Sequence, residues 1–339
     1  MRIGITYNLK SNPSIPTQNE NFDDQEEEFD LPETIDAIQE VLKIEGFEVF
    51  RLGGDIEVIH KIRHEQIDFV FNLAEGRGGR SREAHIPSLL EMMEIPYSGS
   101  DPLGLAVTLE KGITKRIAAS LAIPTPSFWI LDGLDDLAKV PHHFPLFVKP
   151  LWQGSSRGIR RTSRVEKDED LEREVSRLIE NYATDGILVE EYVEGREFTV
   201  AVTGNKNPEI IGIMEIAFRD PRQKDFCYSL EVKRNWKKEV EYHVPPSLER
   251  RVEDAICKSA LRLFKALRLR DIARFDFRMD PNGLFYFLEV NPLPGLSPES
   301  GDLVILAQKK GWSYRDLILK ITQSAFSRYP ELNAKSNVH

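Results

Sequence analysis

Two acids, an asparagine and an arginine interrupt the apolar runs of ARFDFRMDPNGLFYFLEVNPLPGL, residues 273–296. An Asn-Gly pair between two β-rich runs favours a hairpin with a two-residue type I′ turn, because both central residues of that turn need a positive φ. With Asn282-Gly283 as the turn, Pro281 lies opposite Leu284, and each further step adds one residue to each strand. This register fixes which of the polar residues face one another.

In this register Asp276 lies opposite Glu289, and Arg274 lies opposite Asn291. Side chains two apart on a strand share a face, so all four project from one side. The core-facing side would carry Phe275, Phe277, Leu288 and Val290. Two facing carboxylates repel unless a cation lies between them, and Mg²⁺ binds one or two carboxylates together with phosphates and waters. The pattern indicates a divalent metal site; a salt-bridged surface hairpin with Arg274 as counter-ion is the alternative.

A lysine and a small glycine-serine loop are candidates for phosphate binding. Lys149 ends the apolar strand LFVKP, where an ammonium group needs an anionic partner, either a carboxylate or a phosphate. The loop GSSRG at 154–158 follows, and its backbone N–H groups, its hydroxyls and Arg157 could surround a phosphate. The spacing is neither a Walker A motif nor a dinucleotide fingerprint, so a plain turn is the alternative. By residue type alone, Lys111, Lys115 and Lys233 are ordinary surface lysines.

The segment ILVEEYVEGRE, residues 187–197, would suit an adenosine. Glu190 offers a polar acceptor at a strand end, Tyr192 and Val193 offer flat apolar surface and main-chain groups, and Glu197 could accept from ribose hydroxyls. A charged edge strand is the alternative.

Several predicted elements would position these residues. Runs at 2–7, 46–52 and 67–73 predict strands, and a helix between the first two begins at Pro32 and ends at Gly46, which indicates a parallel sheet in an α/β domain. The run at 20–30 holds seven acids and predicts a solvated loop. Further helices are expected near 166–183, 247–269 and 302–322. Expected boundaries give domains at 1–100, 101–186 and 187–325, with a tail at 326–339.

Length and composition restrict the class of protein. A chain of 339 residues implies two or three domains, and 41% hydrophobic with 29% charged residues is ordinary for a globular protein. The net charge of −10 argues against an extended nucleic-acid surface. No apolar run reaches the roughly 18 residues of a membrane span, and no signal segment opens the chain. Cys227 and Cys257 have no paired spacing, so we expect a reduced, cytoplasmic protein. From the net charge and the lengths of the apolar runs we expect neither nucleic-acid nor membrane partners.

The order of these segments resembles the ATP-grasp fold, and most closely the D-alanine–D-alanine ligase family. The resemblance covers roughly residues 65–322 and is carried by GRGG at 76–79, PYSGS at 96–100, VKPLWQGSSRG at 148–158, EEYVEGREFTV at 190–200 and the hairpin at 273–297. It implies an α/β protein with an N-terminal parallel-sheet domain and two α+β subdomains that grip ATP.

The resemblance also implies roles for single residues. The residues implied for ATP are Lys111, Lys149, Ser155, Ser156, Glu190, Tyr192, Val193, Glu197 and Lys233. Asp276, Glu289 and Asn291 fall on the ligands of two Mg²⁺ ions, which Mn²⁺ could replace. Arg274 and the Gly295 N–H resemble the family's donors to an oxyanion. Ser155 resembles the family's loop serine, which closes over the reaction centre, and Ser300 falls where the family binds the carboxylate of the second substrate. The implied reaction forms an acylphosphate from ATP and a carboxylate, joins it to an amine, and releases ADP and phosphate.

Departures from the family pattern concern the first substrate. The family's Ser-x-Glu motif is absent from the long loop at 8–31, where Glu26, Glu27, Glu28 or Asp30 could substitute for its glutamate. Glu75 replaces a histidine, Arg80 and Arg82 follow the Gly-Gly pair where an acid is usual, and Arg234 replaces a tyrosine. Two guanidinium groups in this pocket would favour a substrate more negative than D-alanine; pairing of both with nearby acids is the alternative.

Three interpretations of function remain. The first is an amino-acid or peptide ligase whose first substrate is not D-alanine. The second is a true D-alanine–D-alanine ligase of peptidoglycan precursor synthesis, and the third is a non-catalytic ATP-binding module. The resemblance also implies a homodimer formed through the N-terminal domain.

Overall fold

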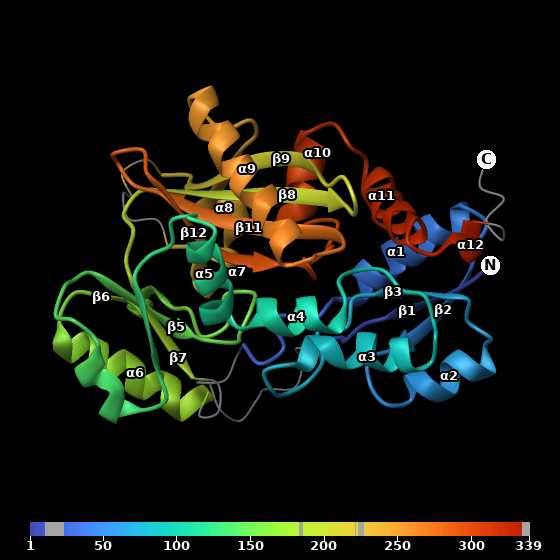
Figure 1. Ribbon diagram of the computed structural model, residues 1–339, viewed down its shortest axis with the longest axis horizontal. Coiled ribbons are helices and arrows are strands. Elements are labelled where there is room, and N and C mark those ends of the chain that lie inside the picture. The colour runs from blue at the N-terminus through green and yellow to red at the C-terminus, as the bar shows by residue number, and fades with distance from the viewer. Residues whose placement is uncertain (11–23, 183–185, 221, 223–226, 334–339) are drawn as a thin grey trace.

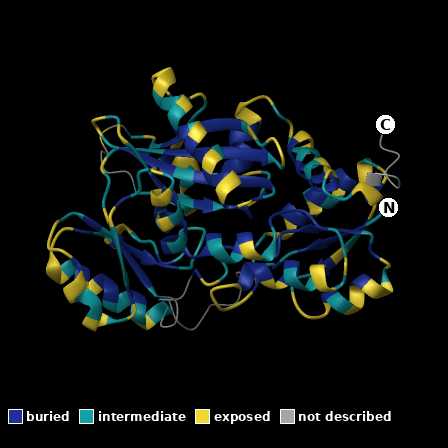
Figure 2. Cartoon of the chain, in the orientation of Figure 1, coloured by how far each residue is buried: buried dark blue, intermediate teal, exposed yellow. Residues whose placement is uncertain are grey.

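The computed structural model describes residues 1–10, 24–182, 186–220, 222 and 227–333. Three sheets divide the chain (Figure 1): a parallel sheet near the N-terminus and two antiparallel sheets. Residues of both antiparallel sheets line one cleft. The sheets and the helix faces against them are buried, and the exposed residues lie on outer helices and loops (Figure 2).

The N-terminal sheet has the order β2-β1-β3, with β1 (Arg2–Thr6), β2 (Glu48–Gly53) and β3 (Phe69–Asn72) all parallel. Its helices are α1 (Pro32–Ile44), α2 (Val58–His64) and α3 (His85–Met92). The predicted strands and the first helix are confirmed: Pro32 opens α1, and Gly46 follows its end with φ +84°.

The second sheet has the antiparallel order β4-β7-β5-β6 and is formed by β4 (Phe128–Leu131), β5 (Leu146–Pro150), β6 (Arg164–Val165) and β7 (Ile187–Glu191). Helix α6 (Asp168–Tyr182) packs its apolar stripe on this sheet. Because β7 pairs with β4 and β5, a boundary at 186–187 would separate β7 from its own sheet, and a boundary after β7 keeps the sheet whole.

The third sheet has the antiparallel order β10-β9-β8-β11-β12 and consists of β8 (Arg196–Gly204), β9 (Glu209–Phe218), β10 (Val240–His243), β11 (Asp271–Met279) and β12 (Phe285–Asn291). Helix α9 (Arg250–Ala266) packs on one face, while α10 (Asp302–Lys309) and α11 (Tyr314–Phe326) join the core shared with the N-terminal domain. The single helix expected near 302–322 is therefore two helices, separated by Gly311 with φ +89°.

The remaining elements are short. The helices are α4 (Pro102–Leu109), α5 (Lys111–Ser120), α7 (Leu230–Arg234), α8 (Trp236–Glu239) and α12 (Pro330–Asn333), and the 3₁₀ turns are η2 (Arg82–Ala84), η3 (Leu134–Lys139) and η4 (Arg161–Ser163). Among the described residues, no helix is both long and apolar enough to cross a membrane.

The hairpin of β11 and β12 has the predicted pairing but not the predicted turn. Its loop has three residues, 281–283, of which Gly283 has a positive φ, and Asp280 N–H donates to Leu284 O at 2.9 Å. The extra turn residue shifts the pairing of the two strands by one residue. A bulge at Leu288 shifts the pairing back, so Asp276 still pairs with Glu289. The bulge also turns Leu288 from the expected core position into the cleft between the two antiparallel sheets.

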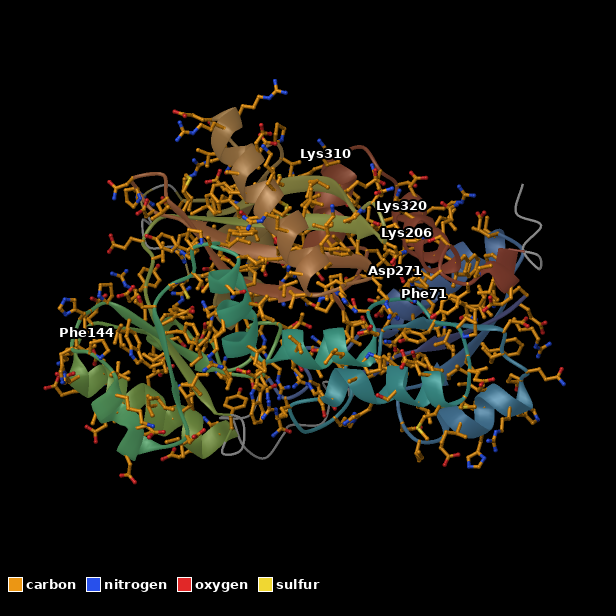
Figure 3. All side chains as sticks on the ribbon, viewed as in Figure 1. Phe71, Phe144, Lys206, Asp271, Lys310 and Lys320 are labelled. Carbon is orange, nitrogen blue, oxygen red and sulfur yellow. The ribbon has the colours of Figure 1, made fainter. Side chains whose placement is uncertain are left out.

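A buried acid joins the third sheet to the N-terminal domain. Asp271 is fully buried and accepts hydrogen bonds from Gly99 N–H at 2.8 Å and from Arg328 Nη2 at 2.7 Å. Arg328 also donates to Tyr97 O at 2.6 Å. Figure 3 labels Asp271 at this junction. These contacts help to hold the N-terminal domain against the sheet that carries the hairpin.

Candidate active site

The cleft between the two antiparallel sheets holds a pocket that collects most of the residues predicted to bind a nucleotide. We call it the nucleotide pocket; its lining includes Lys149, Ser155, Ser156, Glu190, Tyr192, Val193, Glu197, Lys233, Arg274, Asp276 and Glu289. The rings of Phe147 and Tyr192 stack at 6.0 Å between centroids, next to Ile159 and Leu288, which gives this pocket a flat apolar part. Lys111 lines a neighbouring pocket instead.

Two lysines hold the Glu190 carboxylate at the floor of the nucleotide pocket. Lys149 Nζ lies 2.7 Å from Glu190 Oε1, and Lys115 Nζ lies 2.6 Å from Oε2. Burial alone would raise the pKa of Glu190, but the two ammonium groups lower it to about 2. Burial lowers the pKa of Lys115 to about 8, with Glu190 opposing that change. Glu190 is thus an ion-paired carboxylate that fixes Lys149 at the pocket.

The prediction that Lys111 and Lys115 lie at the surface is wrong. Both are buried on α5, which begins with Glu110 as a cap that accepts from Gly112 N–H at 3.0 Å. Lys111 donates to Gln153 O, and its Nζ lies 3.8 Å from Glu289. Their i, i+4 spacing, which places both on one helix face, is the signal that could have identified Lys115.

The glycine-serine loop adopts a backbone conformation that few residues tolerate. Ser155 and Ser156 have φ values of +49° and +60°, and such strain often marks a ligand-binding site. Gly158 has φ +72°, and a Cβ there would lie 2.4 Å from Pro150 Cγ, so glycine is required. Ser156 Oγ donates to Tyr228 O at 3.0 Å, which ties the loop to the third domain.

The acidic run does not form a solvated loop in its described part. Glu28 is buried and accepts from Gly154 N–H at 2.5 Å and from Arg157 Nη1 at 3.0 Å. Asp24 accepts from Gly158 N–H at 2.9 Å and from Tyr182 Oη at 2.6 Å. The solvated-loop prediction is wrong for these two acids because the glycine-serine loop offers them backbone donors; residues 20–23 lie outside the described part.

The proposed metal ligands lie together on the hairpin. Asp276 faces Glu289 across the strands and accepts from Arg274 Nη2 at 2.9 Å and from Thr199 Oγ1. Burial raises the pKa of Asp276. Burial opposes ionisation of Glu289 as well, but Lys111, Lys149 and Arg274 lower its pKa. Asn291 lies two residues beyond Glu289, and its Oδ1 accepts from Leu293 N–H at 2.9 Å. Two opposed carboxylates and an amide oxygen fit the hard donor set of Mg²⁺.

A buried acid that sequence reasoning missed lies behind Arg274. Asp302 begins α10, and its Oδ2 lies 3.5 Å from Arg274 Nη1, while Tyr228 Oη donates to its Oδ1 at 3.1 Å. Burial lowers the pKa of Lys233, and Asp302 opposes this change. Asp302 thus fixes the arginine that faces the pockets. It stands at the start of a helix expected from residue 302, where an acid is ordinary, so the sequence carries no local signal of this role.

Two further pockets adjoin the nucleotide pocket. The acidic pocket is lined by Glu28, Glu75, Glu83, Thr108, Leu109, Lys111, Gln153, Gly154, Ser155, Arg274, Glu289, Val290, Asn291 and Pro292. The wide pocket, a cavity of about 250 Å³, includes Lys233, Arg234, Arg274, Asn291, Gly295 and Ser300 in its lining. Arg274 and Ser155 line all three pockets, so the three cavities meet at these two residues.

The two arginines predicted to bind the first substrate lie outside this lining. Arg82 is buried, and its Nη2 donates to both oxygens of Glu28, at 2.7 and 2.9 Å, while its Nη1 donates to Trp152 O at 2.9 Å. Arg80 is exposed, with its guanidinium 5.6 Å from the centre of the Trp152 ring. For Arg82 the structure matches the alternative, pairing with the acidic run. Glu75, by contrast, lines the acidic pocket as expected for a pocket residue.

Comparison with known proteins places the chain in a family. Residues 134–323 match the family model described as the D-ala D-ala ligase C-terminus. A D-alanine–D-alanine ligase of Aquifex aeolicus is 34% identical over 284 residues, covering 83% of this chain and 91% of that protein. An uncharacterized protein of Sinorhizobium fredii, y4sG, is 35% identical over 264 residues, covering 77% of this chain and 75% of that protein.

Solved structures show the same fold. A D-alanine–D-alanine ligase of Bacillus anthracis complexed with ATP superposes with a TM-score of 0.72 at 22% identity, covering 98% of this chain and 99% of that one. The VanG D-Ala:D-Ser ligase of Enterococcus faecalis gives a TM-score of 0.71 at 20% identity, covering 96% and 99%. The expected ATP-grasp fold is thereby confirmed. With a family model over more than half of its length and relatives above 30% identity along most of it, the chain belongs to the D-alanine–D-alanine ligase family and is an ATP-dependent carbon–nitrogen ligase.

Proposed function

We propose that this ligase joins the carboxylate of one amino acid to the amine of a second, through an acylphosphate, and that its first substrate is not D-alanine. The observation that carries the proposal is the meeting of three pockets at Arg274 and Ser155. A reaction of ATP with two further substrates needs three such cavities around one centre. The nucleotide pocket would hold ATP, the acidic pocket the carboxylate donor, and the wide pocket the amine.

The reaction proceeds in two steps. An oxygen of the donor carboxylate attacks the γ-phosphorus of ATP, the bond from that phosphorus to the bridging oxygen breaks, and ADP leaves. The amine of the second substrate then attacks the acyl carbon and loses a proton, and phosphate departs with the electron pair of its bond to carbon. The protein mainly positions these groups and offsets their charge.

Individual side chains have roles that follow from their places. Lys149 and Lys233 line the nucleotide pocket, and their ammonium groups would neutralise phosphate oxygens. Arg274, kept charged by Asp276 and Asp302 despite its burial, would donate to the oxyanion formed when the amine attacks. Asp276, Glu289 and Asn291 would hold two Mg²⁺ ions, or Mn²⁺ in their place; the metal would supply further neutralisation of phosphate charge.

The first substrate is inferred from the wall of the acidic pocket. The family's Ser-x-Glu motif is absent, and Glu75 stands where the family has a histidine. The Glu28 carboxylate already accepts hydrogen bonds from Arg82, Arg157 and the Gly154 N–H. These changes alter the part of the site that would contact the donor, whereas the nucleotide pocket keeps all of its expected residues except Lys111. Synthesis of D-alanyl-D-alanine is the second candidate, supported by the names of the relatives that align over most of this chain. A non-catalytic module is disfavoured by the shared placement of Arg274, Asp276 and Glu289.

Phosphate release, screened over pairs of amino acids and amino-capped acids with Mg·ATP, tests this function. We expect ADP and phosphate to appear only when a donor and an amine are both present, with a pair other than two D-alanines preferred. Robust synthesis of D-alanyl-D-alanine above all other products would favour the second candidate. The absence of Mg·ATP or Mg·ADP binding in calorimetry at millimolar nucleotide would contradict the function altogether.

Replacement of Glu289 tests the metal site separately. Glu289→Gln should lower turnover more than it lowers nucleotide affinity, because its carboxylate would hold metal where negative charge develops during phosphoryl transfer. Equal losses in both would show that Glu289 has only a structural role.

We also propose, from the family resemblance, a homodimer formed through the N-terminal domain. Light scattering at assay concentration should give about twice the 38.9 kDa chain mass, and a monomeric mass would remove this proposal.

A further inference from the structure

One carboxyl in the lining of the wide pocket has no bonded partner in the described part of the chain. It belongs to Asp30, and the described residues form neither a hydrogen bond nor an ion pair within 4.0 Å with it. The main chain of Asp30 is nevertheless fixed, because its N–H donates to Asn8 O at 2.9 Å and its carbonyl accepts from Lys10 N–H at 3.0 Å. The structure thus keeps an unpaired carboxyl at a defined place in the wall of this cavity.

The cationic side chains of the same lining have other partners. Lys10 and Arg234 both pair with Glu27, at 3.6 and 3.0 Å between nitrogen and oxygen. Arg274 is held by the two acids described above, and Lys233 also lines the nucleotide pocket, where its ammonium group would meet a phosphate. A cation for the unpaired carboxyl would therefore come from the substrate that enters the wide pocket.

The place of Asp30 in the cavity shows which part of that substrate it faces. The amine that is joined must reach the acyl carbon where the three pockets meet, at Arg274 and Ser155. Asp30 lines the wide pocket and neither of the other two, so it faces a part of the substrate away from the reacting amine. The substrate's own carboxylate would be repelled by Asp30 and is expected at Ser300 instead. The side chain of the substrate is the part that remains.

The wall around Asp30 suits a long alkyl stem. Phe29 and Leu31 flank it in the chain and line the same pocket, as does Trp236 of α8. The cavity measures about 250 Å³, against about 90 Å³ for the nucleotide pocket, so it has room for a substrate well beyond alanine in size. Long basic side chains lay their methylene groups on apolar surface and keep the charged end at a polar group. A basic side chain therefore matches both the apolar wall and the carboxyl.

The electrostatics of Asp30 agree with a missing cation. Burial raises the pKa of Asp30 to about 7, although Lys10 opposes the change. The other titratable groups that face it are Glu75 and Tyr314. A cationic group bound beside the carboxyl would lower this pKa again, so that Asp30 would release a proton as the substrate binds near neutral pH.

We propose that Asp30 binds the positively charged side chain of the amine substrate, which is therefore a basic amino acid of the lysine, ornithine or arginine type. The inference rests on the proposed function and deepens it by naming the class of the second substrate and a residue that selects it. For Asp30 it replaces the role at the first substrate that the sequence suggested, because Asp30 lines the wide pocket and not the acidic pocket.

Pairs of basic and neutral acceptors test this class. The full-length protein is incubated with Mg·ATP, the carboxylate donor found in the screen and one acceptor at a time, and phosphate release and product mass are measured. The acceptors are lysine, ornithine and arginine, their neutral counterparts norleucine, norvaline and citrulline, and alanine, each in both configurations. We expect a kcat/KM roughly 10- to 100-fold higher for a basic acceptor than for its neutral counterpart, because the neutral side chain leaves Asp30 unpaired.

Two acetylated lysines test the orientation of the acceptor. Nε-acetyl-lysine keeps the α-amine but loses the side-chain charge, so it should be used no better than norleucine. Nα-acetyl-lysine keeps the charge but lacks a free α-amine, so it should give no product.

A conservative variant separates recognition of the charge from structural effects. Asp30→Asn should raise the KM for the preferred basic acceptor roughly 10-fold or more, leave the KM for ATP unchanged, and narrow the preference over the neutral counterpart. Glu57→Gln, which changes an exposed acid of the same domain, is the matched control and should behave as the wild type.

Hydroxylamine in place of the amine substrate distinguishes a failure of this inference from a failure of the function, because it traps the acylphosphate as a hydroxamate. If hydroxamate forms, the inference alone is overturned by a neutral acceptor used as well as a basic one, by product from Nα-acetyl-lysine, or by an Asp30→Asn protein that keeps the full preference. The failure of every donor to give hydroxamate, with ATP still bound, would overturn the proposed function itself and this inference with it.

Discussion

Removal of the Glu83 charge should stabilise the protein above neutral pH. Burial raises the pKa of Glu83 from its reference of 4.5 to about 7, and the groups that face it are Arg82, Lys111, Glu28 and Glu75. A carboxyl whose pKa is raised by folding leaves stability intact below the unfolded pKa and removes it as pH rises through the folded pKa. Wild-type stability should therefore fall between about pH 5 and pH 8 relative to Glu83→Gln.

The size of the effect follows from the two pKa values. One pKa unit corresponds to about 1.4 kcal/mol, so a change from 4.5 to about 7 implies a penalty of up to roughly 3 kcal/mol at pH 8. Glu83→Gln removes that penalty and keeps the side-chain volume. Urea unfolding of the ligand-free protein at pH 5, 6.5 and 8 measures the difference, with Glu57→Gln as the control.

The variant should exceed the wild type by less than about 1 kcal/mol at pH 5 and by about 3 kcal/mol at pH 8. A Glu83→Gln protein that is less stable than the wild type at pH 8, or a difference that does not vary with pH, would refute this reasoning. Either result would mean that Glu83 has a partner that stabilises its charge.

Three other substitutions test separate parts of the structure. Lys115→Met should destabilise the protein by about 2–4 kcal/mol in urea unfolding, because one of the two cations on buried Glu190 is lost; an unchanged midpoint would contradict that pairing. Gly158→Ala should lower the melting temperature strongly, since a Cβ there meets Pro150 Cγ at 2.4 Å, whereas Gly78→Ala, with φ +70° and nothing within 4 Å, should cost only about 1 kcal/mol. Equal losses would remove the steric argument. Asp271→Asn should destabilise by about 3 kcal/mol in calorimetric unfolding, and a neutral effect would show that the domain junction does not depend on this acid.

Local patterns were enough for the elements that depend on nearby residues. The parallel strands near the N-terminus and the helix from Pro32 follow from apolar periodicity and end signals. The pairing of Asp276 with Glu289 was also predicted correctly, but only because two unpredicted shifts in strand register cancel. The longer turn shifts the register by one residue, and the bulge at Leu288 shifts it back. A bulge depends on the packing of the whole sheet, so the turn residues could not reveal it.

Contacts between distant segments could not be predicted from the sequence. The acidic run looks identical whether it is solvated or docked, and only the fold brings Glu28 to Arg82 and to the loop at 154–158. Asp302 and Lys115 have the same difficulty, since their partners, Arg274 and Glu190, lie far from them in the sequence. The family resemblance placed the nucleotide residues in one cleft, but it could not predict the charge of a pocket whose residues depart from the family pattern.

The central claim is that this enzyme activates an amino-acid carboxylate as an acylphosphate, and oxygen transfer measures it most directly. The donor found in the screen is labelled with ¹⁸O in its carboxylate, and the phosphate released during ligation is analysed by mass spectrometry. The account predicts one ¹⁸O atom in each phosphate, because a carboxylate oxygen becomes the bridge to phosphorus and leaves with it. Phosphate that carries no ¹⁸O while product forms would contradict the account.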